Sequence, residues 1–231
     1  MAQQLLSTLP REDFERLRVS LQPVTLVLGD VIYESSARLN HLYFPTSCVV
    51  SLLYTMENGS VAEMGLVGND GVVGIALFLG GQTTPNRAVV QIGGQALRMN
   101  AKTLREEFAL GGPFHHMLLR YTQALITQIS QTAVCNRLHS VEQRLCRWLL
   151  LIHDRLNSDD IAMTQDLIAN MLGGRRESVT IAAARLQAAG LINYSRGHIN
   201  IVDRQGLEAQ VCECYRIVAA ELNRLLRLSV N

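Results

Sequence analysis

The chain has 231 residues, of which 48% are hydrophobic and 18% are charged. This composition is typical of a folded protein with one large or two ordinary domains, and it excludes an extensively disordered chain. The formal net charge is only +1, so any affinity for nucleic acid has to come from local clusters of basic residues.

The sequence shows neither a secretory signal nor a membrane anchor. The N-terminal stretch lacks a basic region followed by a long apolar core, and no run approaches about 18 consecutive apolar residues. We therefore expect a cytoplasmic protein that has no contact with a membrane. The cysteines number five, an odd count scattered over a long chain, which argues against a disulfide framework.

The N-terminal part of the chain changes from a helical to a strand-like pattern near position 23. Residues 1–20 predict a short helix pair, and residues 23–99 contain many short apolar runs separated by turns. Asn58 and Gly59 form a strong hairpin signal, and the run 65–74 is the densest in glycine. This pattern predicts an all-β sandwich or roll.

A long helix is predicted over residues 113–139, where the period becomes helical. Two neighbouring stripes recur along it at helical spacings, so one stripe can pack on the roll and leave the other for a partner helix. The alternative is a helix that is wholly buried in its own domain.

A second domain is predicted to begin at Ser140. Ser140 and Gln143 match the capping-box pattern, so a new helix starts here and residues 138–140 form a hinge. This helix extends to about Leu156. Near the end of the chain, residues 204–227 predict one last amphipathic helix.

Residues 164–192 predict two short helices joined by a tight turn. Thr164 is a suitable N-cap for the first helix, Gly173 ends it, and the second begins near Arg176. Two short helices joined by a glycine turn are typical of a helix-turn-helix. Residues 191–202 then predict two short strands around a turn, which would form a wing. The alternative is an ordinary helical hairpin with a solvated charged face.

The outward face of the second helix and the wing carry side chains that suit base edges and phosphates. Arginine can donate to guanine, glutamate can accept from cytosine, and isoleucine can contact a thymine methyl group. The candidate DNA-binding residues are Thr164, Gln165, Arg175, Arg176, Glu177, Ser178, Thr180, Ile181, Arg185, Arg196 and His198.

The run from Gly173 to Val179, GGRRESV, followed by a wing, resembles the Crp/Fnr family of bacterial transcription regulators. The chain departs from the family pattern at Arg175, where a serine N-cap is common, and at Ile181, where the best-known members carry a third base-reading arginine. We therefore expect a different target sequence.

The resemblance implies an α+β fold with three parts. These are a β-roll like the cyclic-nucleotide-binding jelly roll in residues 1–112, a dimerisation helix in residues 113–139 and a winged helix-turn-helix in residues 140–231. The long helix makes the dimer in this family, so a homodimer is implied. The stripe assigned to the partner helix contains Met117, Tyr121, Ala124, Gln128, Gln131 and Cys135.

The family's effector pocket would lie near Gly74, where its phosphate-binding cassette begins. Cyclic-nucleotide binders place a glutamate directly after this glycine to hold the ribose hydroxyl, and Ile75 stands there instead. Arg87 is the candidate for the cyclic phosphate, but it lies slightly off the expected register. A buried, unpaired hydroxyl costs about 1–3 kcal/mol, so we expect that cyclic-nucleotide binding has been lost. The residues of this candidate pocket are Gly74, Ile75, Ala76, Arg87 and Ala88.

Cys212 and Cys214 form a weak metal-like pair. One residue separates them in a predicted helix, so their thiols should point in different directions, and no second pair stands nearby in the sequence. We therefore expect no metal site and no cofactor, with the cysteines as buried or incidental thiols.

The prediction that results is a dimeric, sequence-specific, DNA-binding transcription regulator without enzymatic activity, since the sequence contains no recognisable catalytic motif. Its expected partners are double-stranded DNA and a second copy of the chain. RNA polymerase and an unknown small-molecule effector are further candidates. Two alternatives stay open: a ligand- or partner-sensing module that does not read DNA, and a redox- or haem-responsive DNA-binding sensor.

Overall fold

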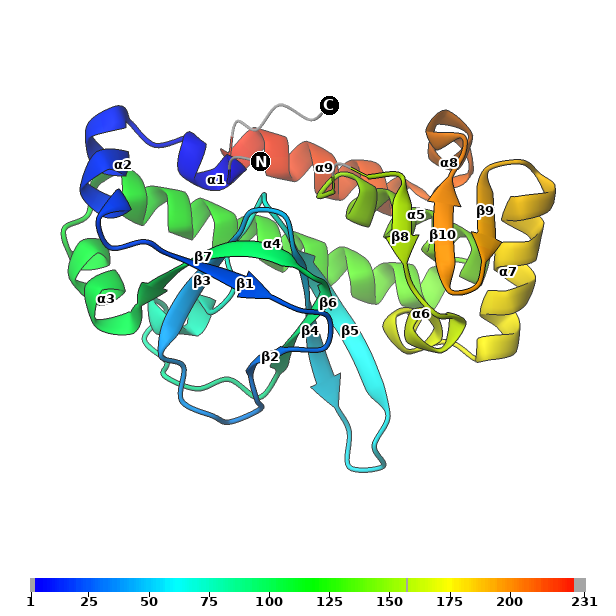
Figure 1. The fold of residues 1–231 in the computed structure, drawn as a ribbon, viewed down its shortest axis with the longest axis horizontal. Helices are drawn as coiled ribbons and strands as arrows, with labels where there is room; N and C mark the ends of the chain where they lie inside the picture. Colours follow the sequence, from blue (N-terminus) through cyan, green and yellow to red (C-terminus); the bar gives the residue numbers. More distant parts are fainter. Residues whose placement is uncertain (1–2, 157, 227–231) are drawn as a thin grey trace.

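The computed structural model describes residues 3–156 and 158–226. They form an N-terminal β-roll, a long helix and a C-terminal helix-turn-helix with a small β-wing (Figure 1). The predicted α+β fold is therefore confirmed. Within these residues, no helix is long and apolar enough to cross a membrane.

The β-roll is built from short helices and two antiparallel sheets. Its elements are α1 (Gln4–Ser7), α2 (Arg11–Arg18), β1 (Gln22–Leu26), β2 (Val31–Tyr33), β3 (His41–Pro45), β4 (Val49–Thr55), β5 (Val61–Val67), the 3-10 helix η1 (Ile75–Leu77), β6 (Arg87–Ile92), β7 (Gly94–Asn100) and α3 (Ala101–Ala109). The strand orders are β1-β7-β3 and β2-β6-β4-β5. Between β4 and β5, Gly59 has a φ of 81°, which only glycine adopts readily, so the predicted hairpin turn is confirmed.

The longest element is helix α4 (Gly112–Leu138), which passes across the roll and on toward the C-terminal part (Figure 1). Helix α4 packs closely on the roll because glycines, which have no side chain, lie beneath it. A Cβ atom at Gly65 would lie 2.9 Å from Gln128 Nε2, and one at Gly71 would lie 2.5 Å from the Tyr121 side chain. The glycine-rich run therefore provides a close packing surface for α4 in addition to turns.

The stripe of α4 that we assigned to a partner helix faces the protein's own interior, so this assignment is wrong. Gln128 shows the physical reason, because its amide nitrogen donates to the Leu66 carbonyl at 3.0 Å and its oxygen accepts from Arg155 at 3.2 Å. Gln128, a polar residue of the stripe, therefore makes hydrogen bonds within the chain and not with a partner helix. Of its members, Gln131 is half-buried and the others are buried, namely Met117, Tyr121, Ala124, Gln128 and Cys135.

The C-terminal part begins with the predicted capping box. Ser140 Oγ accepts from the Gln143 backbone N–H at 3.2 Å, and Gln143 Oε1 accepts from the Ser140 backbone N–H at 3.1 Å. The elements that follow are α5 (Val141–His153), β8 (Asp160–Ala162), α6 (Gln165–Leu172), α7 (Arg176–Ala188), β9 (Ile192–Ser195), β10 (His198–Ile201), α8 (Arg204–Gln210) and α9 (Glu213–Leu226).

The single helix predicted over residues 204–227 is two helices in the structure, and residue 227 lies outside the described residues. Val211 has an extended backbone, with φ −70° and ψ 150°, which ends α8. The break allows α9 to turn back and lie along α4 (Figure 1). Leu225 and Leu226 of α9 consequently join the buried core of the roll.

The roll and the C-terminal part share a second hydrophobic core. Val49, Leu53 and Leu66 from the roll belong to the same buried cluster as Trp148 and Leu149 of α5. Burying apolar side chains from both parts in one cluster holds the helix-turn-helix against the four-stranded sheet.

Candidate DNA-binding surface

The helix-turn-helix is formed by α6 and α7, and local signals define its ends. Thr164 Oγ1 accepts from the Leu167 backbone N–H at 3.3 Å, which caps α6 as predicted. Gly173 ends α6 in a left-handed conformation with φ 58°. Ala169 and Val179 are both buried where the helices meet, at 4% and 0% exposure. A small residue in α6 and an apolar one in α7 thus permit the close crossing.

Helix α7 buries one face and presents the other to solvent. Ile181 is 55% exposed on the outward face, and it belongs to none of the hydrophobic clusters formed by the described residues. Thr180 Oγ1 donates to Gln165 Oε1 at 2.8 Å, which links this face to the start of α6. Ser178 and Gln165 are half-buried, whereas the exposed predicted residues at this site are Thr164, Arg175, Arg176, Glu177, Thr180, Ile181 and Arg185.

Two of the predicted arginines form exposed ion pairs. Arg176 Nε lies 3.4 Å from Asp166 Oδ1, and Arg185 Nη1 lies 3.5 Å from Glu142 Oε2. Ion pairs of this exposed kind contribute about 0–1 kcal/mol, so DNA can replace the carboxylates at small cost. Neither acidic partner was predicted from the sequence. Asp166 lies in the first turn of α6 and could have been found, but Glu142 comes from α5 and depends on the tertiary fold.

The wing is a three-stranded sheet with the order β8-β10-β9. The alternating pattern predicts β9 and β10, whereas β8 spans only three residues and was not predicted. At the turn, Arg196 and Gly197 have φ values of 50° and 80°. The Gly197 carbonyl accepts from the Met163 backbone N–H at 2.7 Å, which ties the turn to the start of α6 beside Thr164. Exposed His198 lies 3.1 Å from Asp160. His198 pairs with Ala162 of β8, two residues before Thr164, so the wing turn with Arg196 lies near the N-terminus of α6.

The side chains of the candidate effector pocket make contacts within the roll. Ile75 is half-buried and packs against the hydrophobic core, directly after Gly74 with its φ of 109°. Arg87 Nη2 lies 3.3 Å from Glu34 Oε1, so an acidic side chain of the roll already faces its charge. Ala76 is half-buried and Ala88 is fully buried, and neither carries a polar side-chain atom that could recognise a ligand.

Comparison with known domain families matches both parts of the chain. Residues 23–109 match the cyclic nucleotide-binding domain, and residues 143–210 match the Crp-like helix-turn-helix domain. The chain belongs to the Crp/Fnr family of transcription regulators. This Crp/Fnr regulator is thus a DNA-binding protein and not an enzyme, and members of the family are typically dimeric.

Solved structures of other regulators share the fold of this Crp/Fnr protein. FixK2 from Bradyrhizobium japonicum is 16% identical with a TM-score of 0.70, and the alignment covers 83% of this chain and 98% of FixK2. A CRP-family transcriptional regulator from Thermus thermophilus is 17% identical with a TM-score of 0.68, covering 81% of this chain and 95% of that one. The c-di-GMP-responsive regulator CLP from Xanthomonas campestris is 15% identical with a TM-score of 0.64, covering 83% and 99%. No curated protein sequence matches this chain significantly.

Proposed function

We propose that this regulator binds double-stranded DNA in the cytoplasm as a homodimer and reads its operator with the exposed face of α7. The observation that carries the proposal is the exposure of Arg176, Glu177 and Ile181 on α7, together with exposed Arg196 in the wing turn, which is bonded to the start of α6. The N-terminal residues of a recognition helix commonly contact base edges in the major groove, while flanking residues contact phosphates.

Arg176→Ala is expected to lower operator affinity by about 1–3 kcal/mol and to relax the preference at one base pair in each half-site, because it removes a bidentate contact to guanine. Arg196→Ala is expected to weaken binding to all sequences alike and to reduce the salt slope by about 1, because it removes a phosphate contact. The operator would first be selected from a random duplex library, and both variants would then be compared by fluorescence-anisotropy competition against single-base operator variants.

Arg216→Ala serves as the control, since Arg216 is an exposed arginine on α9, outside the proposed surface. It should leave both the base preference and the salt slope unchanged. If Arg176→Ala weakens every operator variant equally, or has no effect, α7 does not read the sequence. The alternative of a sensing module that does not read DNA would then gain support.

The proposed dimer uses the outer face of α4. The side of α4 opposite its buried stripes carries a row of exposed apolar residues. Leu119, Ile126 and Val134 there are 41%, 57% and 43% exposed. Their near-heptad spacing suits packing against the same helix of a second copy. A single recognition helix makes few contacts, and a two-fold axis doubles them on half-sites about one helical turn apart.

Ile126→Asp is expected to convert the dimer to a monomer, because a carboxylate in an apolar helix interface loses its hydration. Light scattering at micromolar concentration measures the change directly. Met56→Asp is a matched control, since Met56 is 59% exposed at the β4–β5 hairpin and lies away from α4. A wild-type chain that is monomeric with and without DNA would contradict the proposal.

Cyclic AMP and cyclic GMP are not expected to bind measurably. Ile75 has no acceptor for a ribose hydroxyl, and the charge of Arg87 faces Glu34. Isothermal titration calorimetry checks the prediction. A low-micromolar dissociation constant for either nucleotide would show that the pocket recognises its ligand in another way.

A further inference from the structure

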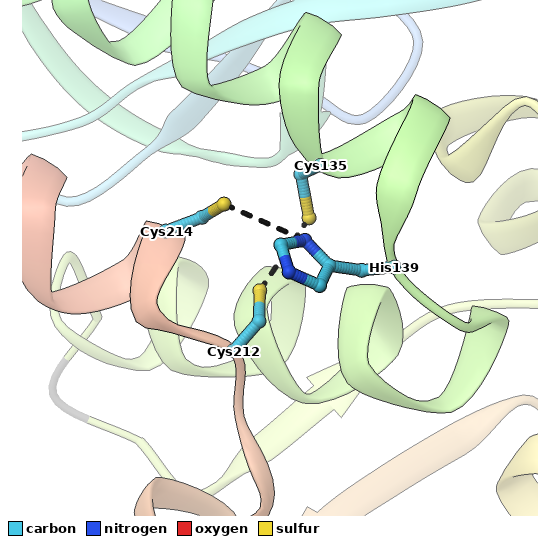
Figure 2. Close-up of side chains that lie close together, drawn as sticks. All are labelled: Cys135, His139, Cys212 and Cys214. Atoms are coloured by element: carbon cyan, nitrogen blue, oxygen red, sulfur yellow. Dashed lines mark hydrogen bonds between the residues drawn. The ribbon is translucent and has the colours of Figure 1, made fainter.

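Four potential metal ligands meet where α9 lies against the end of α4. Cys135 lies in the last turns of α4, and His139 follows directly after that helix. Cys212 lies in the link between α8 and α9, and Cys214 lies in the first turn of α9. Figure 2 shows the three thiols arranged around the imidazole ring. Residues separated by more than 70 positions thus form one compact cluster.

The separations between the ligand atoms suit a single tetrahedral ion. Cys135 Sγ lies 3.6 Å from Cys212 Sγ, and Cys214 Sγ lies 3.6 Å from His139 Nδ1. All four ligand atoms lie within 4.8 Å of one another. Zinc–sulfur bonds of about 2.3 Å in a tetrahedral arrangement place neighbouring sulfurs about 3.8 Å apart. The side chains therefore need only small movements to surround one ion.

The orientation of the histidine provides a second, independent observation. His139 directs Nδ1 toward the thiols, while its Nε2 lies 3.3 Å from Glu213 Oε2. A metal-bound histidine usually has its other ring nitrogen paired with a carboxylate or carbonyl, which fixes the ring and strengthens the ligand. Glu213 stands between Cys212 and Cys214 in the sequence, so one short segment supplies two ligands and the partner of a third.

We propose that Cys135, His139, Cys212 and Cys214 bind one zinc-like divalent ion in a closed structural site. Four protein ligands leave no open position for a substrate, which distinguishes a structural from a catalytic zinc site. On binding, each of the three thiols releases its proton to solvent and coordinates as a thiolate. An iron–sulfur cluster would interpose several irons and sulfides between the thiolates, and the short separations disfavour it.

The position of the site indicates what the ion does. It joins the end of α4, just before Ser140, to the start of α9, and so fastens the C-terminal helix against α4. Buried Arg147 of α5 donates to Thr132 of α4 at 2.9 Å and faces the same region. Three thiolates and one divalent cation leave one net negative charge, which this guanidinium can balance.

The expectation from the sequence that Cys212 and Cys214 carry no metal site is thus replaced by this proposal. It assumed that both lie in one helix with thiols pointing apart. Helix α9 begins at Glu213, so Cys212 lies in the extended link, and both thiols turn toward Cys135.

Metal content of the untagged full-length chain tests the proposal. Mass-spectrometric elemental analysis should find about one zinc per chain. Cys135→Ser, Cys212→Ser, Cys214→Ser and His139→Ala should each lose the ion. Cys146→Ala is the matched control, because Cys146 is a buried thiol of the same region outside the four-ligand cluster, and this variant should retain the ion. Cobalt(II) added to the metal-free chain should give the thiolate charge-transfer and ligand-field bands of a tetrahedral site.

Glu213→Gln provides a second test of the zinc site that does not require the ligand variants to fold. Glu213 has a 64% exposed side chain, and the variant retains all four ligands. Its zinc affinity, measured by competition with a chromogenic chelator, should fall about 10–100-fold. Glu208→Gln, an exposed change on α8, should not alter it.

Four results would overturn the proposal. The first is a folded wild-type chain that contains no stoichiometric metal and gives no tetrahedral cobalt spectrum. The second is iron accompanied by acid-labile sulfide, and the third is a Cys135–Cys212 disulfide in place of the ion. The fourth is equal loss of metal in Cys146→Ala. None of these outcomes depends on DNA binding, so they are separate from the test of α7.

Discussion

Arg155→Ala is expected to lower the free energy of unfolding by about 3–5 kcal/mol, the usual cost of breaking a buried ion pair by removing one partner. Arg155 follows α5 and is only 3% exposed. Its Nη2 lies 2.7 Å from Asp70 in the loop of the roll, and it also donates to Gln128 of α4 and to the Leu151 carbonyl. One guanidinium therefore joins the roll, α4 and the DNA-binding part.

The loss arises because alanine leaves the Asp70 carboxylate, which is 14% exposed, without its cation. In a thermal melt, a loss of this size corresponds to a decrease in Tm of roughly 6–20 °C for a chain of this length. Asp70→Asn in the Arg155→Ala background should restore part of the stability, because the amide carries no uncompensated charge.

Arg18→Ala is the control for Arg155→Ala. The Arg18–Glu15 pair has a similar separation of 2.9 Å but side chains that are 65% and 50% exposed, so its loss should cost less than about 1 kcal/mol. Equal effects of the Arg18 and Arg155 substitutions would show that burial of the Arg155–Asp70 pair does not increase its contribution to stability.

The free energy of unfolding of the wild-type protein is expected to decrease as the pH rises from 4.5 to about 7, and Glu63→Gln is expected to abolish this decrease. Glu63 lies in β5, 8% exposed, and accepts from Ser51 Oγ at 2.6 Å. Burial raises the pKa of its carboxyl from 4.5 to about 7, although the Ser51 hydrogen bond and the charge of Arg147 oppose this rise. The folded chain consequently holds a proton that the unfolded chain has already released.

The direction of the effect follows from this pKa. Below pH 4.5 the Glu63 carboxyl is protonated in both the folded and the unfolded state, so its ionisation favours neither state. As the pH rises toward 7, the unfolded state gains from ionisation while the folded state does not. The free energy of unfolding therefore falls, and the decrease reaches about 3 kcal/mol at pH values above the folded-state pKa.

Urea unfolding at several pH values across this window measures the effect. Glu63→Gln should match the wild type below pH 4.5 and exceed its stability above pH 7, because the amide can still bond to Ser51 without ionising. Glu57→Gln, at the exposed tip of the same hairpin, should reproduce the wild-type profile. A Glu63→Gln profile parallel to that of the wild type would contradict the prediction.

Several features of the fold and the DNA-binding surface could be predicted from the sequence because they depend on near neighbours. The Thr164 cap, the Gly173 turn and the Ser140 capping box each involve groups within a few residues, and all three are present. The outward face of α7 follows from helical periodicity once the apolar positions are identified. The wing followed from alternation in β9 and β10, whereas the short β8 gave no comparable signal.

Tertiary structure alone decided which side chains from distant segments meet. The stripe containing Gln128 and Cys135 has the periodicity of an interface, but periodicity cannot tell whether a partner helix or the protein's own roll covers it. The pairing of Arg155 with Asp70 and the burial of Glu63 depend on how α5 lies against the sheet. The cluster of Cys135, His139 and the two C-terminal cysteines exists because Val211 breaks the last helix and lets α9 fold back along α4. Local backbone preferences act over a few residues, whereas these contacts arise from the packing of whole helices, so no short pattern in the sequence records them.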